Sequence, residues 1–445
     1  MLKRAFSILV AILIILTIPT FQVNAQYAPD EEIYSQCALL INLDTDKTIY
    51  EKNADKHMPP TAFNKVMTAM LAFENTEDIN TKMVTVSDAI LEDKNLVYNS
   101  SGLVAGEQIS MKDLLYNILV GSANDCCAVI AEEIGGTQRN FAKMMNERAE
   151  QLGCENTIFV NAHGMDEEEQ HTTCNDMAKI AKQAIKIPGF LDMCSQTSYV
   201  VPATNKNQEH KIRTSNQMMV STSQYYYSPV KGIKYGSTDD GGRCFISTAT
   251  KDGYNYLLIL MGGPIEDSQG NDLDFNSAFK DAKTLYQWAF DNFKIRQLVE
   301  ENTPIAEIKV KSSWDADVVH VIPESTVTAL INKSIDINDQ QSVQFLKNLP
   351  EYIEAPIEKG QILGSMEIVA DGETLGQVNL VAAESIKRSG YLSFLDKVKE
   401  VIGQTWFKIT AISIAVLLIA YVITTIIINY VKKSKKRKSN GNNKK

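Results

Sequence analysis

Three short runs of residues in this chain have the types and spacing of a covalent acyl-transfer site, and one run is incomplete. The first ends in Lys65, the second is Ser122-Ala123-Asn124, and the third is Lys234-Tyr235-Gly236. A hydroxyl is a poor nucleophile until a base takes its proton, and a lysine three residues further along a helix can reach it. The amides at the N-terminus of such a helix can also stabilise an oxyanion. The residue three positions before Lys65 is an alanine, which has no oxygen to act as the nucleophile.

The order and surroundings of these runs resemble the S-x-x-K, S-x-N and K-T-G motifs of the penicillin-binding D-alanyl-D-alanine carboxypeptidases, a family of serine peptidases. Each motif alone is a weak signal, but the residues beside the motifs fix the register. The neighbouring stretches that resemble the family are Pro60, Val66-Met67-Thr68-Ala69, Gly121, Asp125, Asn161-Ala162-His163-Gly164, Gly232-Ile233, Thr238 and Leu380-Val381-Ala382-Ala383-Glu384. The resemblance covers roughly residues 30–431, nearly all of the chain.

The resemblance implies that the first two runs carry the proton transfers of the family reaction. Ala62 occupies the position of the nucleophilic serine, and Lys65 occupies that of its base. Ser122 matches the proton shuttle, and Asn124 matches the residue that holds the substrate amide. Two plainer interpretations stay open: Lys65 is an inherited cation without a ligand, or Ser122 is a helix N-cap. Thr61 is a candidate replacement nucleophile, but it lies four residues before Lys65 and precedes the helix tip.

The resemblance implies that the third run holds the terminal carboxylate of a substrate. Lys234 matches the carboxylate-binding cation, and Gly236 matches the residue that keeps the strand open to substrate. The backbone amides of Ala62 and Ser237 match the oxyanion hole. Tyr235 stands where the family has threonine, so its phenol could reach a carboxylate or its larger ring could fill the cleft.

The loss of the nucleophile decides the expected activity. Removing the nucleophile of a serine protease lowers the rate about 10⁶-fold, and no acyl-enzyme can form on Ala62. We therefore expect an inactive homologue that keeps weak affinity for peptidoglycan stem peptides ending in D-Ala-D-Ala. It would act as a binding or regulatory protein at the cell wall, with an active family member or another cell-wall protein as partner. The alternatives are an active carboxypeptidase with an unrecognised nucleophile, and a structural ectodomain with a closed cleft.

Both ends of the chain carry sorting signals. Residues 1–25 combine a basic start with a short apolar run and a small-residue site at Val23-Asn24-Ala25, which is typical of a signal peptide. Residues 409–431 form an uncharged apolar stretch long enough to cross a bilayer. The basic residues within 432–445 predict a cytoplasmic tail. We expect a single-pass protein of the cell membrane with an extracellular ectodomain.

The charge of the exported part excludes some partners. The chain has 44 basic and 54 acidic residues, but eleven basic residues lie in the signal peptide or from Lys408 onward. The part between them carries 33 basic against 54 acidic residues, a net charge of −21. Such a surface argues against binding to nucleic acid or to anionic lipid.

No cofactor or metal is expected from the sequence. The seven cysteines have neither metal nor redox spacing, and the adjacent Cys126-Cys127 fit the core of a helix. The five histidines are scattered and include no H-x-x-x-H pair. We therefore predict neither a metal site nor a histidine-based triad.

The elements that must position these residues predict an α/β (α+β) fold. The resemblance implies a β-lactamase/transpeptidase-like domain with an antiparallel sheet and a helical subdomain, at residues 26–298. A small all-β domain follows at residues 303–386, with a hairpin turn at Asp371-Gly372. Residues 391–407 predict an amphipathic juxtamembrane helix, which lies on the membrane surface or alternatively packs into the β domain.

Periodicity places several elements of the first domain. Residues 63–73 are apolar nearly all round, which predicts a buried central helix, with Thr61 as a candidate N-cap. The other predicted elements are a hairpin at residues 37–50, mainly helices over 84–188, strands at 243–250 and 254–262, and a long amphipathic helix at 275–293.

Overall fold

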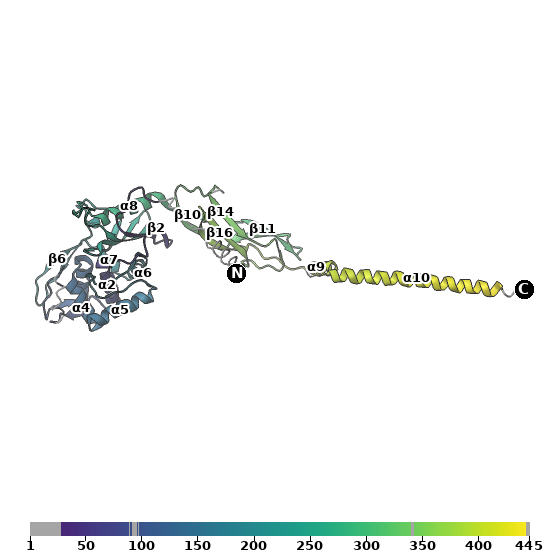
Figure 1. The fold of residues 1–445 in the computed structure, drawn as a ribbon, viewed down its shortest axis with the longest axis horizontal. Helices are drawn as coiled ribbons and strands as arrows, with labels where there is room; N and C mark the ends of the chain where they lie inside the picture. The colour runs from purple at the N-terminus through teal and green to yellow at the C-terminus, as the bar shows by residue number, and fades with distance from the viewer. Residues whose placement is uncertain (1–27, 89, 91–95, 97, 340–341, 442–445) are drawn as a thin grey trace, which may run out of the picture. The chain divides into compact units, whose positions relative to one another are not determined.

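The computed structural model describes residues 28–441 except residues 89, 91–95, 97 and 340–341 (Figure 1). The expected signal peptide lies outside the described residues. The chain divides into two compact units between Lys294 and Ile295, and each is described by itself. Unit 1, which ends at Lys294, contains all three runs singled out above, so the candidate site lies within it.

Unit 1 is built around a five-stranded antiparallel sheet in the order β2-β1-β9-β8-β7. The predicted hairpin and the two predicted strands after residue 242 are confirmed. Strand β7 is at the edge of the sheet, so one side of its backbone can border a cleft. The strands are β1 (Cys37–Asn42), β2 (Lys47–Lys52), β7 (Val230–Thr238), β8 (Gly242–Lys251) and β9 (Tyr254–Gly263).

Alternation of side chains along the strands separates two layers. On β8, Cys244 and Ile246 belong to the main hydrophobic core, whereas Phe245 packs against Phe279 of α8 (Ser277–Asn292). Helix α8 therefore covers one face of the sheet, and the helical subdomain covers the other (Figure 1).

The helical subdomain surrounds a central helix. It comprises η1 (Thr61–Phe63), α2 (Asn64–Glu74), α3 (Met111–Tyr116), η4 (Asn117–Gly121), α4 (Asn124–Gly135), α5 (Gln138–Gln151), α6 (Cys174–Ala184) and α7 (Phe190–Cys194). Two short hairpins and a 3-10 turn complete unit 1: β3 (Met83–Thr85) with β4 (Gln108–Ser110), β5 (Ser198–Val201) with β6 (His210–Arg213), and η5 (Gln217–Met219).

The central helix α2 is buried from Asn64 to Ala72, as its apolar sequence predicts. The expected N-cap at Thr61 is wrong, because Pro60 holds the N-cap position of η1. The Thr61 hydroxyl instead donates to the carbonyl of Pro59 at 3.3 Å. Its φ of 54° lies in the left-handed region, which is uncommon for a β-branched residue.

Unit 2 contains a six-stranded sheet in the order β14-β16-β17-β12-β11-β15 and a separate pairing of β10 with β13. The predicted turn at Asp371-Gly372 is confirmed, since it joins β16 to β17 and both residues have positive φ. The strands are β10 (Phe293–Val299), β11 (Ala306–Lys311), β12 (Val318–Pro323), β13 (Val327–Asn332), β14 (Val343–Asn348), β15 (Tyr352–Glu354), β16 (Ile362–Ala370) and β17 (Glu373–Ala382).

The C-terminal segment is helical. Helix α9 (Gly390–Gly403) is followed, after Gln404, by α10 (Thr405–Gly441). The part of α10 from Thr405 to Lys433 is long and apolar enough to cross a membrane, in agreement with the expected anchor. The exposed apolar residues of α9 include Tyr391 and Phe394, and its position on a membrane surface stays a prediction.

Candidate active site

The floor of the site is formed by η1 and the first turn of α2. Ala62 lies directly beneath β7, because a Cβ atom added to Gly236 would lie 2.4 Å from the Cβ of Ala62. Real Cβ atoms do not approach so closely, so only glycine fits at position 236 without a shift of the backbone. The structure therefore brings the first and third runs into contact.

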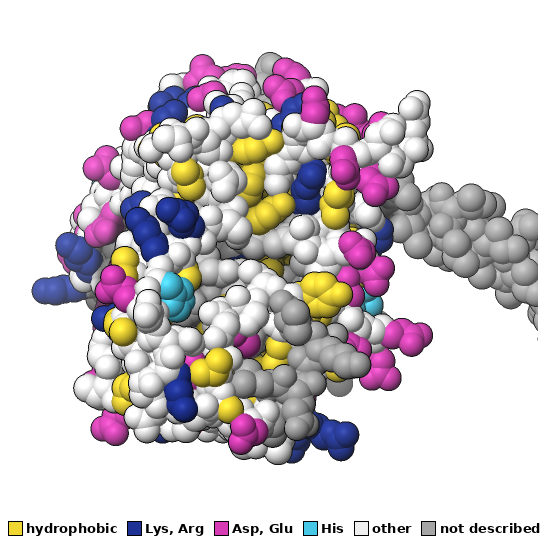
Figure 2. Space-filling model, turned by 90° about the vertical axis from the view of Figure 1, so that its left-hand side faces the viewer, with side chains coloured by type: hydrophobic (Ala, Val, Ile, Leu, Met, Phe, Trp, Pro, Cys, Tyr) yellow, Lys and Arg dark blue, Asp and Glu magenta, His cyan; other side chains and the backbone are white. Residues whose placement is uncertain are grey.

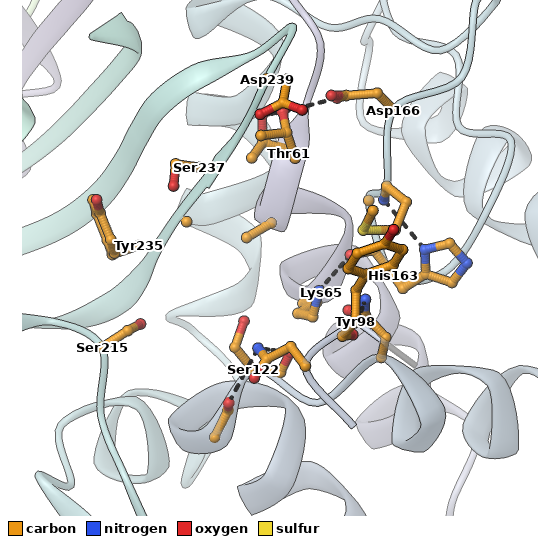
Figure 3. A pocket seen from close by; sticks show the side chains of 18 of the residues that line it. Thr61, Lys65, Tyr98, Ser122, His163, Asp166, Ser215, Tyr235, Ser237 and Asp239 are labelled. Atoms are coloured by element: carbon orange, nitrogen blue, oxygen red, sulfur yellow. Dashed lines mark hydrogen bonds between the residues drawn. The ribbon is translucent and has the colours of Figure 1, made fainter. Parts of the chain in front are cut away.

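The amine of Lys65 is buried and already bonded. Its Nζ donates to the backbone carbonyl of His163 (Figure 3), and one turn later Thr68 Oγ1 donates to the carbonyl of Ala162 at 2.8 Å. Burial lowers the pKa of Lys65, since the charged form loses its hydration. A neutral amine could accept a proton, but Ala62 has no hydroxyl to give one.

Ser122, in the short connection between η4 and α4, and Asn124, the first residue of α4, border the cleft. The Nδ2 of Asn99 donates to the carbonyl of Ser122 at 2.8 Å, and the Nδ2 of Asn124 donates to the carbonyl of Tyr98 at 2.7 Å. The N-cap residue of α4 is Ala123, so the N-cap interpretation of Ser122 is wrong. Ser122 has a left-handed φ of 65° and ends the π-helical turn η4 instead.

Asp125 binds the loop at residues 100–103 to the start of α4 through hydrogen bonds. Its buried carboxylate accepts from the hydroxyls of Ser100 and Ser101 at 2.7 and 2.9 Å. It also accepts from the backbone amides of Ser101, Gly102 and Leu103. This carboxylate thus positions the loop that follows Tyr98 at the rim of the cleft.

Asp125→Asn should lower the free energy of unfolding by about 3 kcal/mol, because an amide accepts fewer of these donors and leaves some of them unpaired. Urea unfolding of the full-length protein measures the change. Asp252→Asn is the control: Asp252 is exposed in a turn with a φ of 52°, which asparagine tolerates. Equal stability of the two variants would contradict the assigned role.

Lys234 points from β7 into the helical subdomain, where its side chain is only 2% exposed. Its Nζ donates to the carbonyls of Ile118 and Leu119 at 2.9 and 3.2 Å. Burial, and then the charge of Lys65, lower its pKa to about 7. This arrangement does not present an exposed cation to a substrate, so carboxylate binding by Lys234 stays a prediction without structural support.

Tyr235 points to the opposite face of β7, as alternation requires. Its hydroxyl accepts from Nδ2 of Asn276 at 2.8 Å, and its ring lies 4.6 Å from that of Phe279 on α8. The expectation that this ring fills the cleft is therefore wrong, although Tyr235 borders the cleft. Packing against α8 holds the ring away from Lys65 (Figure 3).

These segments enclose a cleft of about 850 Å³. Figure 3 shows Ser215, Tyr235 and Ser237 on the strand side, across from Ser122 and Lys65. On the face of unit 1 shown in Figure 2, acidic side chains lie mainly around the margin.

Several cleft residues were not predicted from the sequence. Asp166 closes one end, where it accepts from Oγ1 of Thr238 at 2.8 Å and from the amide of Asp240 at 3.2 Å. Asp166 follows Gly164 by two residues, so its position next to a stretch that resembles the family could have indicated that it lies at the cleft. Tyr98 and Arg213 also line the cleft, but no motif lies beside them in the sequence.

The buried thiols near the lysines are neutral groups. Burial raises the pKa of Cys127 to about 11 and that of Cys194 to about 12. All seven cysteines are buried and unpaired with one another. Within the described part of the chain, no group of three or more His, Cys, Asp or Glu residues could hold a metal ion.

Comparison with protein families defines the class of this protein. Residues 22–264 match the D-alanyl-D-alanine carboxypeptidase family, and residues 293–388 match the C-terminal domain of penicillin-binding protein 5. Since the first match covers more than half of the chain, the protein belongs to the D-alanyl-D-alanine carboxypeptidase family.

Individual relatives agree with this assignment. The chain is 27% identical over 368 residues to the D-alanyl-D-alanine carboxypeptidase DacF of Bacillus subtilis (strain 168), covering 82% of this chain and 88% of DacF. Penicillin-binding protein 5 from Haemophilus influenzae superposes with a TM-score of 0.59 at 25% identity, over 81% of this chain and 100% of that one. The carboxypeptidase DacD from Francisella tularensis superposes with a TM-score of 0.63 at 20% identity, over 83% of this chain and 100% of that one. At this identity the similarity supports the fold only. The expected family and fold are confirmed.

Proposed function

We propose that this protein is a catalytically inactive D-alanyl-D-alanine carboxypeptidase homologue that binds the ends of peptidoglycan stem peptides and acts as a binding or regulatory protein at the cell wall. One observation carries the proposal: Ala62 occupies the nucleophile position, and the amine of Lys65 is bonded to a backbone carbonyl instead of a hydroxyl. Family membership supports the substrate class.

The surroundings of Thr61 argue against a replacement nucleophile. Its side chain is buried, and its hydroxyl lies 3.5 Å from both Oγ1 of Thr238 and Sγ of Cys244. None of these groups is a base that could take its proton at neutral pH, and burial raises the pKa of the Cys244 thiol to about 11. This environment favours the inactive homologue over an active carboxypeptidase that uses Thr61.

The open cleft favours ligand binding over a purely structural ectodomain. Its volume of about 850 Å³ falls within the range of small-molecule sites. The packing of Tyr235 against Phe279 leaves this space unfilled. The protein would act in the cell membrane, anchored by α10, with unit 1 outside the cell and the basic tail in the cytoplasm.

A labelled β-lactam and a peptide ligand test the proposal together. The full-length protein in nanodiscs is expected to form no covalent adduct with fluorescent penicillin, and to bind an N-acylated pentapeptide ending in D-Ala-D-Ala reversibly. Covalent labelling, with the residue located by mass spectrometry, would establish another nucleophile and refute inactivity. Absence of peptide binding would refute the binding role and favour the structural ectodomain.

A further inference from the structure

Arg213 is an exposed cation that lines the cleft. Among the described residues, two lysine or arginine side chains line the cleft, Lys65 and Arg213, and the amine of Lys65 is buried and bonded. Arg213 is exposed, and its guanidinium has no hydrogen bond or ion pair with any other described residue. A free guanidinium in a cleft is a ready partner for an anion, because its fork of donors matches a carboxylate.

The backbone that carries Arg213 is held firmly. The preceding residue, Ile212, packs on Gly121 at the end of η4, beside Ser122. Its strand partner, Tyr199, stacks on Tyr116 with ring centroids 3.7 Å apart. The hydroxyl of Tyr199 also donates to the carboxylate of Asp113 at 2.7 Å, which ties the hairpin to α3. The position of Arg213 is therefore set before a ligand binds, while its side chain is left free.

Hydroxyl groups on the same wall complete an anion-binding surface. Ser215 follows Arg213 by two residues, and Ser237 lies on strand β7; both are exposed and line the cleft (Figure 3). The acidic residues Asp166 and Asp239 lie together at the end of the cleft opposite Ser215 (Figure 3), and Asp240 also lines the cleft. An anionic ligand group would therefore be attracted to the Arg213 side and repelled from the acidic side.

We propose that Arg213, assisted by the hydroxyls of Ser215 and Ser237, binds the terminal carboxylate of the stem peptide in place of Lys234. The inference rests on the proposed binding function and names the residue that gives that site its affinity for an acid-terminated ligand. Lys234 is committed to two backbone carbonyls, and the phenol of Tyr235 is committed to Asn276. Neither of these residues is free to hold the carboxylate.

The experiment measures fluorescence anisotropy with two peptides on the full-length protein in nanodiscs. The peptides are an N-terminally labelled pentapeptide ending in D-Ala-D-Ala and the same peptide with a C-terminal amide. The variants are Arg213→Gln and the control Lys211→Gln, which removes a cation two residues away on the same strand that does not line the cleft. Circular dichroism melts check that both variants fold.

Arg213→Gln should weaken binding of the acid peptide about 10- to 100-fold, and Lys211→Gln should leave it unchanged. Amidation of the peptide should weaken its binding to the natural protein by the same factor, and Arg213→Gln should not weaken binding of the amide peptide further.

Equal affinities of the two variants for the acid peptide would overturn the role of Arg213 while leaving the binding function standing. Equal binding of acid and amide by the natural protein would overturn it as well, even if Arg213→Gln failed to fold. Absence of any binding by the natural protein would overturn both proposals.

Discussion

The Ala62→Ser variant is expected to form a covalent adduct with fluorescent penicillin that the natural protein does not form. A serine nucleophile contributes about 10⁶-fold to the rate in serine proteases, so restoring it should turn an undetectable reaction into labelling within minutes. The expected base is still present, because Lys65 lies one helical turn away with a pKa lowered by burial. Labelled protein on a denaturing gel, with the adduct located by mass spectrometry, measures the result.

The packing around position 62 directs the new hydroxyl. Gly236 lies against the Cβ of Ala62, so that side is closed, and the added oxygen must turn toward the open cleft and Lys65. The double variant Ala62→Ser/Lys65→Met should lose the labelling, because it has no base. Absence of labelling in a folded Ala62→Ser variant would show that more than the nucleophile has been lost from the site.

The sequence left open whether the ring of Tyr235 fills the cleft, and the structure changes the expected effect of replacing it with threonine. Since the ring packs on α8, adding Tyr235→Thr to Ala62→Ser should not increase the labelling. It should instead lower the melting temperature, because the contact with Phe279 and the hydrogen bond from Asn276 are lost. Strongly increased labelling in the double variant would show that the ring obstructs the cleft.

The sequence was sufficient to predict which segments meet at the site. The residues beside each motif fixed the register, and the resemblance then placed Ala62 near the strand segment that contains Gly236. The buried helix α2 and the strands β8 and β9 followed from apolar periodicity. These features depend on local apolar pattern, or on motifs whose neighbouring residues can still be recognised although Ala62 and Tyr235 replace the family residues.

The directions of the side chains were harder to predict. Strand alternation places Tyr235 on the α8 side of β7 once Lys234 is known to point into the helical subdomain. The sequence alone does not determine which way Lys234 points. Arg213 comes from a hairpin with no motif of its own, and its approach to the cleft depends on long-range contacts such as Ile212 with Gly121. The left-handed backbone at Thr61 likewise depends on its neighbours in space, since local preference disfavours it.

The second large expected effect is a gain of stability on removing Lys234. An amine buried in this way favours its neutral form, and its pKa falls from 10.5 to about 7. Between these two values the unfolded chain binds a proton that the folded protein does not, so stability rises with pH from about 7 to 10.5 and is lowest below 7. One pKa unit corresponds to about 1.4 kcal/mol, so the full shift sets an upper limit of about 5 kcal/mol.

Lys234→Met should therefore raise the melting temperature at pH 6.5, and the difference should shrink as the pH approaches 10. Methionine has a similar volume but leaves the carbonyls of Ile118 and Leu119 without this donor, which offsets part of the gain. We expect a net increase of about 2–6 °C at pH 6.5, measured by thermal melts of the full-length protein in nanodiscs.

The control is Lys231→Met, which replaces an exposed lysine on the same strand and should show no such pH dependence. A destabilised Lys234→Met variant at every pH would mean that the two hydrogen bonds outweigh the cost of burial. A gain confined to low pH would show that the fold keeps a buried amine at position 234 at the expense of its own stability.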